Sequence, residues 1–170
     1  MSEPWSQLSD VDRLADRQAD VAFEIPLDQM PRVREQFASA GGKVSGVAHF
    51  RREAGFRVAE LEMSGSAQLV CQRCLEPMQV QIEGHVQVAL IVSQTEADRV
   101  PTEFETVHVP ENHIRVRDLV EEELLLTLPI SPLHAEECGD ASERPEAQPD
   151  APAPDTQRPF EQLGELLKRH

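Results

Sequence analysis

Apolar and polar side chains alternate along the middle of the chain, between residues 43 and 93. The clearest stretch covers residues 78–92, where every even position except Gly84 is apolar and the odd positions from 79 to 87 are polar. A period of two belongs to a β-strand with one buried face, so the stretch predicts one long strand or an antiparallel pair. Gly84 is expected to mark a bulge or bend within it.

The same alternation appears earlier, at residues 59–63 and 67–71, and Gly65 between them is expected to turn the chain. Shorter strands are predicted at residues 21–26 and 104–109. Strands that follow one another at close spacing favour an antiparallel sheet or a small open barrel.

Two short helices are predicted in the first quarter of the chain. One begins at Ser9 or Asp10 and extends toward Asp20. The other begins at Pro31 and ends at the glycine pair of residues 41–42. We expect these helices to cover the sheet.

A third helix is predicted from Asp118, which can cap its first turn, to Leu128, with Pro129 ending it. Its packing face consists of residues spaced four apart: Val120, Leu124 and Leu128. The three consecutive glutamates at 121–123 suit the positive end of the helix dipole, and we interpret them as a solvated face rather than a cluster of catalytic or metal-binding groups. Together the elements predict an α+β domain over residues 1–138, an antiparallel sheet with flanking helices.

The composition changes after residue 138. Residues 139–158 are rich in proline and acidic side chains, which predicts a disordered acidic linker. Residues 159–170 then predict a short amphipathic helix, with Phe160, Leu163 and Leu167 at helical spacing. This segment is expected either to bind a protein partner or to fold back on the domain.

The charge of the chain limits its partners. Its 170 residues carry 16 basic and 31 acidic side chains, a net charge of −15. Such a chain repels phosphate backbones as a whole, so any contact with RNA needs a local basic patch or a protein intermediary. The candidates for that patch are Arg51, Arg52, Arg57 and Arg73. The alternative is ordinary surface charge balanced by neighbouring carboxylates.

Two short motifs carry metal-ligand chemistry. Cys71 and Cys74 have C-x-x-C spacing, and His134 and Cys138 have H-x-x-x-C spacing. Three sulfurs and one imidazole are an accepted tetrahedral zinc set, provided that the fold brings the two motifs together. The alternative is a pair of unrelated turn thiols and a separate tail cysteine. A redox role for Cys71 is disfavoured because a strand, and no helix, is predicted after it.

Other features argue against catalysis, secretion and membrane insertion. The sequence contains no Gly-rich phosphate loop, H-E-x-x-H or G-x-S-x-G motif, so we predict no enzymatic activity and no small-molecule substrate. The N-terminus lacks the pattern of a signal peptide, and no apolar run approaches the roughly 18 residues of a membrane span. Three cysteines suit a reducing compartment. We therefore expect a cytoplasmic protein, and a monomer.

Three stretches of the sequence resemble the YceD family of bacterial proteins linked to accumulation of large-subunit ribosomal RNA. Residues 69–75, LVCQRCL, are similar to the C-x-R-C knuckle of that family. Residues 118–134, DLVEEELLLTLPISPLH, resemble its acidic, leucine-rich helix that ends in L-P-x-x-P-x-H. Residues 159–169, PFEQLGELLKR, resemble its C-terminal motif.

The resemblance implies a non-enzymatic role in ribosome biogenesis, in the synthesis, processing or accumulation of 23S rRNA. The implied partners are large-subunit rRNA or a ribosomal or assembly protein. Many relatives carry further cysteines after the L-P-x-x-P segment, whereas this chain has Cys138 alone there, so a zinc site would need His134. The alternative function is an acidic adaptor that binds a basic ribosomal or other protein without contacting RNA.

Overall fold

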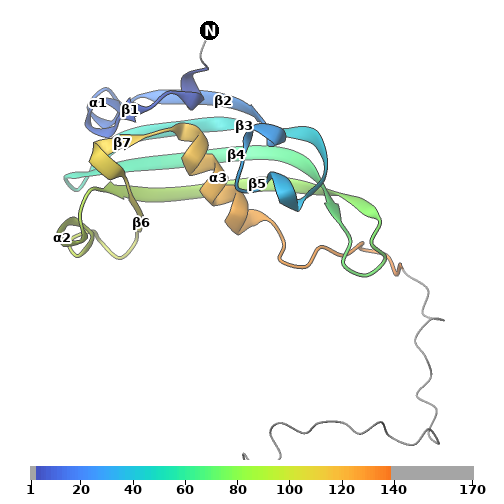
Figure 1. The fold of residues 1–170 in the computed structure, drawn as a ribbon. Coiled ribbons are helices and arrows are strands. Elements are labelled where there is room, and N and C mark those ends of the chain that lie inside the picture. The colour runs from blue at the N-terminus through green and yellow to red at the C-terminus, as the bar shows by residue number, and fades with distance from the viewer. Residues whose placement is uncertain (1–2, 139–170) are drawn as a thin grey trace, which may run out of the picture. The chain divides into compact units, whose positions relative to one another are not determined.

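The computed structural model describes residues 3–138, and Figure 1 shows their arrangement. The predicted linker over 139–158 and the amphipathic segment over 159–170 lie outside the described residues. The strands are β1 (Ser9–Asp10), β2 (Asp20–Pro26), β3 (Phe37–Glu53), β4 (Phe56–Val70), β5 (Pro77–Ile91), β6 (Glu105–His108) and β7 (His113–Ile114). The helices are α1 (Val11–Asp16), α2 (Gln94–Ala97) and α3 (Val116–Thr127), with short 3-10 turns at Pro4–Ser6, Leu27–Gln29, Arg34–Gln36 and Pro110–Asn112.

The main sheet has five strands in the order β2-β3-β4-β5-β6, so it is open, with β2 and β6 at its edges. The first four strands pair antiparallel, but β6 runs parallel to β5. The loop that carries α2 brings the chain back across the sheet, so β6 runs in the same direction as β5. The antiparallel sheet predicted from the sequence did not include this parallel pair. Strands β1 and β7 form a separate two-stranded pair. The predicted α+β class is confirmed.

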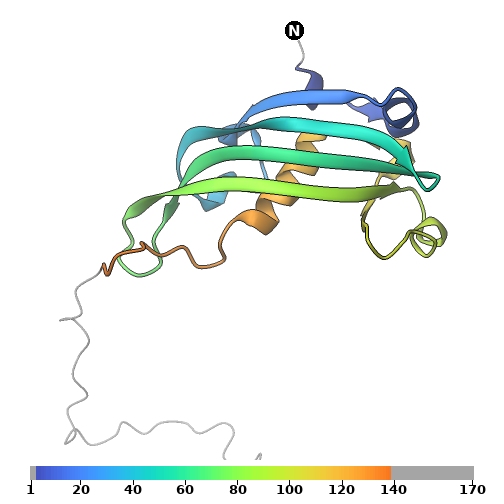
Figure 2. The same ribbon diagram turned by 180° about the vertical axis from the view of Figure 1, so that it is seen from behind.

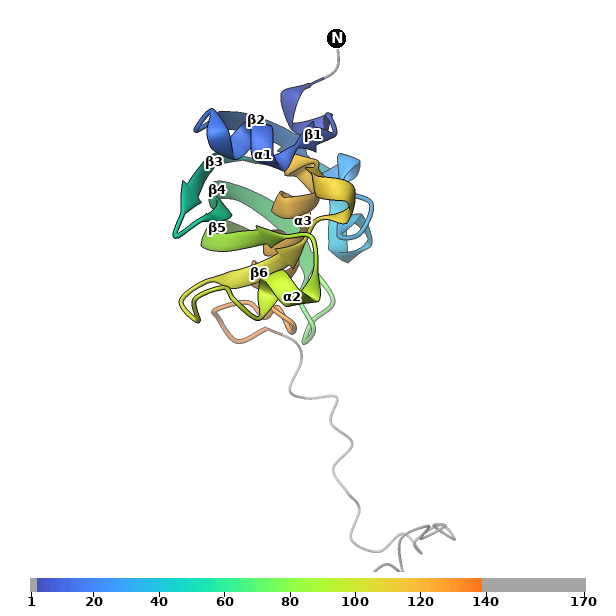
Figure 3. The ribbon, with the colours of Figure 1, turned by 90° about the vertical axis from the view of Figure 1, so that its left-hand side faces the viewer.

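Helix α3 packs on one face of the sheet (Figures 1 and 3), and Figure 2 shows that no helix of the described residues covers the other face. The predicted packing face of α3 is correct: Val120, Leu124 and Leu128 are all buried. They join a core that includes Ile25 and Leu61 from the sheet. In the described part of the chain, no helix has both the length and the apolar character needed to cross a membrane.

The sequence predicted a turn at Gly65 and a bulge or bend at Gly84, and the structure has neither the turn nor the bulge. Gly65 does not turn the chain, because β4 continues through it, and a Cβ there would lie 2.4 Å from the carbonyl oxygen of Lys43. Gly84 forms no bulge, because the pairing of β4 with β5 continues through it without a shift, opposite Met63. A Cβ on Gly84 would lie 2.6 Å from the Met63 methyl carbon. Both glycines permit close packing within long strands.

The helix predicted from Pro31 to residues 41–42 is also wrong. Only the 3-10 turn Arg34–Gln36 forms there, and β3 begins at once with Phe37. Phe37 pairs with Leu69 of β4, and the register shifts before Gly42, whose φ of +121° suits glycine. The glycine pair therefore belongs to an irregularity within a strand.

The glutamates of α3 do not form a uniformly solvated face, which corrects that interpretation. Glu121 is 2 % exposed, and its Oε1 accepts a hydrogen bond from the backbone N–H of Arg32 at 2.5 Å. Glu122 remains exposed and pairs with the Arg32 guanidinium at 2.6 Å. The loop before β3 thus supplies the donor that a buried carboxylate requires. The helix begins at Val116, so Asp118 lies in its first turn and Arg115 takes the cap position.

Candidate metal centre

The turn between β4 and β5 places two thiols together. The backbone N–H of Cys71 donates to the carbonyl of Glu76 at 3.0 Å, and that of Leu75 donates to the carbonyl of Cys71 at 2.9 Å. Leu75 has a positive φ of 62°, which lets the chain reverse tightly. Cys71 is fully buried at the base of this turn, and Cys74 is half-buried three residues later.

The chain after α3 returns to this turn and supplies the other two ligand side chains. Pro129 follows the helix, and the carbonyl of Pro132 accepts a hydrogen bond from the backbone N–H of Gln72 at 2.8 Å. This contact fixes the segment 129–138 beside the turn. His134 and Cys138 then lie next to Cys71 and Cys74. The fold thus brings the two motifs together, although 60 positions separate Cys74 from His134.

The ligand atoms have the spacing of a tetrahedral metal site. The Sγ atoms of Cys71 and Cys138 are 3.6 Å apart. The Nδ1 atom of His134 lies 3.3 Å from the Sγ of Cys74 and 3.2 Å from that of Cys138. All four atoms lie within 4.8 Å of one another. Zinc–ligand bond lengths in a tetrahedron imply separations of about 3.8 Å between sulfurs and about 3.6 Å between sulfur and nitrogen. The four side chains therefore fit zinc in both chemistry and spacing.

The surroundings of the cluster favour thiolates. Burial opposes ionisation of Cys71, but backbone N–H groups of Cys74 and Arg73 outweigh it and bring the pKa of Cys71 down to about 5. Burial also opposes ionisation of Cys138, yet the side chains of Arg73 and His134 lower its pKa. The hydrogen bond to Cys138 raises the pKa of His134. Since thiolate is the form that binds metal, two of the three sulfurs are prepared for a cation.

For Cys74 the balance is reversed. The backbone N–H of Glu76 lowers the pKa of Cys74, but burial and the neighbouring sulfurs of Cys138 and Cys71 together raise it. Like charges at this distance disfavour a further thiolate until a cation compensates them. Without a cation, the neighbouring sulfurs therefore disfavour the thiolate form of Cys74.

The four arginines predicted to face RNA lie in different surroundings. Arg51 pairs with Glu60 at 2.6 Å and with Glu53 at 3.0 Å. Arg52 bridges two carboxylates of α1, Asp12 at 2.6 Å and Asp16 at 2.5 Å.

Arg57 is buried, and its guanidinium contacts Glu96 and the side-chain oxygen of Asn112, so it presents no charge to a partner surface in this structure. Arg73 remains exposed but donates into the thiol cluster. The structure therefore does not bring the four guanidinium groups into one patch free of carboxylates. Their role in RNA binding stays a prediction.

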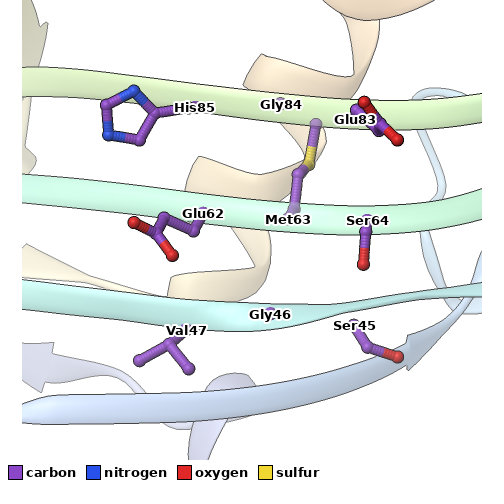
Figure 4. Close-up of a pocket in the computed structure, with 9 residues that line it drawn as sticks. All are labelled: Ser45, Gly46, Val47, Glu62, Met63, Ser64, Glu83, Gly84 and His85. Carbon is purple, nitrogen blue, oxygen red and sulfur yellow. The ribbon is translucent and has the colours of Figure 1, made fainter.

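A second group of ligand-type side chains lies on the uncovered sheet face: Glu60 and Glu62 of β4 and His85 of β5. The hydrogen bond from His85, followed by those from Gln87 and Arg51, lowers the pKa of Glu60 to about 2. Glu60 is therefore already compensated by protein groups. Glu62 and His85 also line a shallow hollow of about 600 Å³ (Figure 4). The cysteine cluster, with three soft donors and a buried member, is the better metal site.

The sequence pattern identified all four side chains of the cluster, but it did not predict that Arg73 contacts them. The position of Arg73 between the two cysteines was visible in the C-x-R-C motif. Its contacts with residues 134–138, however, depend on the return of the chain after α3, for which there is no local signal. No sequence pattern predicted the Gln72–Pro132 hydrogen bond either.

The fold and the cluster define a small α+β protein in which a candidate metal centre brings together the β4–β5 turn and the segment after α3. The model of one family, described as large ribosomal RNA subunit accumulation protein YceD, matches residues 59–167. The chain belongs to this family. The match includes the turn with Cys71 and Cys74, helix α3, and His134 with Cys138. No solved structure matches the chain.

Proposed function

We propose that this protein is a non-enzymatic ribosome biogenesis factor that promotes the synthesis, processing or accumulation of 23S rRNA of the large ribosomal subunit. The family match over residues 59–167 carries this proposal. A factor of this kind works in the cytoplasm, where its partners are large-subunit rRNA or a ribosomal or assembly protein.

We further propose that Cys71, Cys74, His134 and Cys138 hold a structural zinc ion. Four protein ligands complete a tetrahedral shell and leave no coordination position for substrate or water, which distinguishes structural from catalytic zinc sites. The spacing of the four ligand atoms supports this proposal. The ion would join two segments that are distant in the sequence.

Depletion of the protein tests the proposed function. We expect the ratio of mature 23S to 16S rRNA to fall in depleted cells, with an accompanying deficit of large subunits in sucrose-gradient profiles. Expression of the full chain from a second locus should restore the ratio. An unchanged ratio with normal ribosome profiles would contradict the proposal.

The ion pairs of Arg51 and Arg52 favour a second mode of action, in which the protein is an acidic adaptor that reaches rRNA through a basic protein. Carboxylates on β3, β4 and α1 already compensate both guanidinium groups. In a chain with a net charge of −15, electrostatic attraction then favours a basic protein over a phosphate backbone.

Charge reversal distinguishes the two modes. Direct contact predicts that Arg51→Glu combined with Arg52→Glu abolishes ultraviolet crosslinking of the protein to rRNA. The adaptor mode predicts that co-purification of rRNA continues in the double variant and requires a protein partner. Arg99→Glu combined with Arg115→Glu makes the same charge change outside the predicted patch and serves as the control.

A further inference from the structure

Among the four arginines of the predicted patch, Arg73 is the one whose side chain contacts the metal centre. Its Nε donates to the Sγ of Cys138 at 3.2 Å. Its Nη2 donates to two backbone carbonyls, those of His134 at 3.2 Å and Glu136 at 2.5 Å. Whereas Arg51, Arg52 and Arg57 contact carboxylates, Arg73 contacts a ligand sulfur and the backbone between two ligands.

The backbone of Arg73 faces the cluster as well. Its N–H lies 3.5 Å from the Sγ of Cys71 and donates to it. One residue therefore donates to two of the three sulfurs, through the main chain to Cys71 and through the side chain to Cys138. It connects the β4–β5 turn to the segment 134–138 at three points of that segment.

Charge gives this position a function. Three thiolates around one divalent ion leave one negative charge uncompensated. The nearby segments add Glu76, Glu136 and Glu137, and Arg73 is the single lysine or arginine within residues 71–76 and 129–138. A guanidinium hydrogen-bonded to a ligand sulfur compensates the excess charge without competing for the metal.

We propose that Arg73 is a positioning residue of the metal centre: it holds the segment 134–138 against the β4–β5 turn and neutralises the negative charge of the loaded cluster. This inference rests on the proposed zinc site. It assigns Arg73 to metal binding rather than to RNA recognition.

The planar fork of arginine is required for this arrangement. Nε and Nη2 point in fixed directions and reach a sulfur and two carbonyl oxygens together. A lysine ammonium would keep the charge, but it cannot reproduce the fixed geometry of the fork. Charge and geometry can therefore be separated by substitution.

The experiment compares the full chain with Arg73→Met, Arg73→Lys and Arg51→Met. Arg51→Met is the matched control, because it removes a guanidinium that is also hydrogen-bonded, to Glu53 and Glu60, but that lies on the sheet, away from the cluster. Zinc affinity is measured by competition with a chromophoric chelator. Cobalt is added separately, since its sulfur-to-metal charge-transfer band reports thiolate coordination. Thermal unfolding of the metal-free proteins reports the fold alone.

We expect Arg73→Met to bind zinc about 10–100-fold more weakly than the wild type. Its cobalt charge-transfer band should be shifted or reduced, and its unfolding temperature should fall more in the metal-loaded protein than in the metal-free protein. Arg73→Lys should recover part of the affinity, and Arg51→Met should bind zinc normally.

Two results would overturn the inference. The first is wild-type zinc affinity and an unaltered cobalt spectrum in Arg73→Met. The second is an equal loss of stability with and without metal, which would show a purely structural role for Arg73. Absence of zinc and cobalt binding in the wild type would overturn the zinc site together with this inference, while rRNA levels after depletion would still test the cellular function separately.

Discussion

Replacing Cys71 by serine is expected to abolish stoichiometric zinc binding and the stability that depends on it. Cys71 is fully buried, and its Sγ lies 3.6 Å from that of Cys138. A serine hydroxyl is a poor zinc ligand, and the three remaining side chains do not close the tetrahedron. Wild-type protein purified without chelator should hold about one zinc per chain, and the variant less than about one tenth of that.

The accompanying loss of stability follows from mass action. A ligand that binds only the folded state at about 1,000 times its dissociation constant stabilises that state by about 4 kcal/mol. We therefore expect a loss of this order in Cys71→Ser at such a zinc concentration, measured by urea unfolding. Chelation should remove this stabilisation from the wild type and leave the variant unchanged.

Ala59→Ser is the matched control for Cys71→Ser. Ala59 is also fully buried in β4, so its replacement buries a hydroxyl without touching the cluster. This control should keep its zinc and remain sensitive to chelator. Zinc content near one per chain in Cys71→Ser would contradict the proposed ligand set.

Gly46→Ala should destabilise the sheet by about 3 kcal/mol, the upper part of the usual range for overpacking. Gly46 lies in β3 opposite Met63 of β4. A Cβ at this position would lie 1.9 Å from the carbonyl oxygen of Glu62 and 2.7 Å from the Cζ atom of Phe23. The first obstacle is backbone in the central hairpin and cannot rotate away, so the strands would have to separate. Urea unfolding followed by circular dichroism measures the effect.

Gly41→Ala provides the same chemical change in the same strand at an open position. The nearest atom to a Cβ there is the Ser39 hydroxyl oxygen at 3.7 Å, which is ordinary contact. We expect a change within about 0.5 kcal/mol. Equal stabilities for the two variants would show that β3 and β4 can move apart at Gly46 without cost.

The sequence predicted best what depends on local periodicity. The alternation at residues 78–92 corresponds to β5, and the spacing of Val120, Leu124 and Leu128 identified the buried face of α3. The two cysteine–histidine motifs likewise named the four side chains that the fold gathers. In each case the periodicity or spacing of the residues reflects the element on which they lie.

The wrong predictions depend on contacts between distant segments. Gly65 resembles a turn residue and Gly84 a bulge or bend, but at both positions a neighbouring strand lies where a Cβ would be. Glu121 resembles a solvated glutamate, but the loop at Arg32 buries it and provides its donor. Propensity and local pattern carry no information about such neighbours, so tertiary packing decides these positions.

The cysteine–histidine centre also closes a long loop. Cys74 and His134 are 60 positions apart, and β5, α2, β6, β7 and α3 lie between them. An ion bound there cross-links the chain as a disulfide would, and closure of a loop of this length removes about 4 kcal/mol of entropy from the unfolded chain. Unlike a disulfide, this cross-link opens when the ion leaves. The availability of zinc in the cell would then set how firmly α3 and the second half of the sheet are held in the folded state.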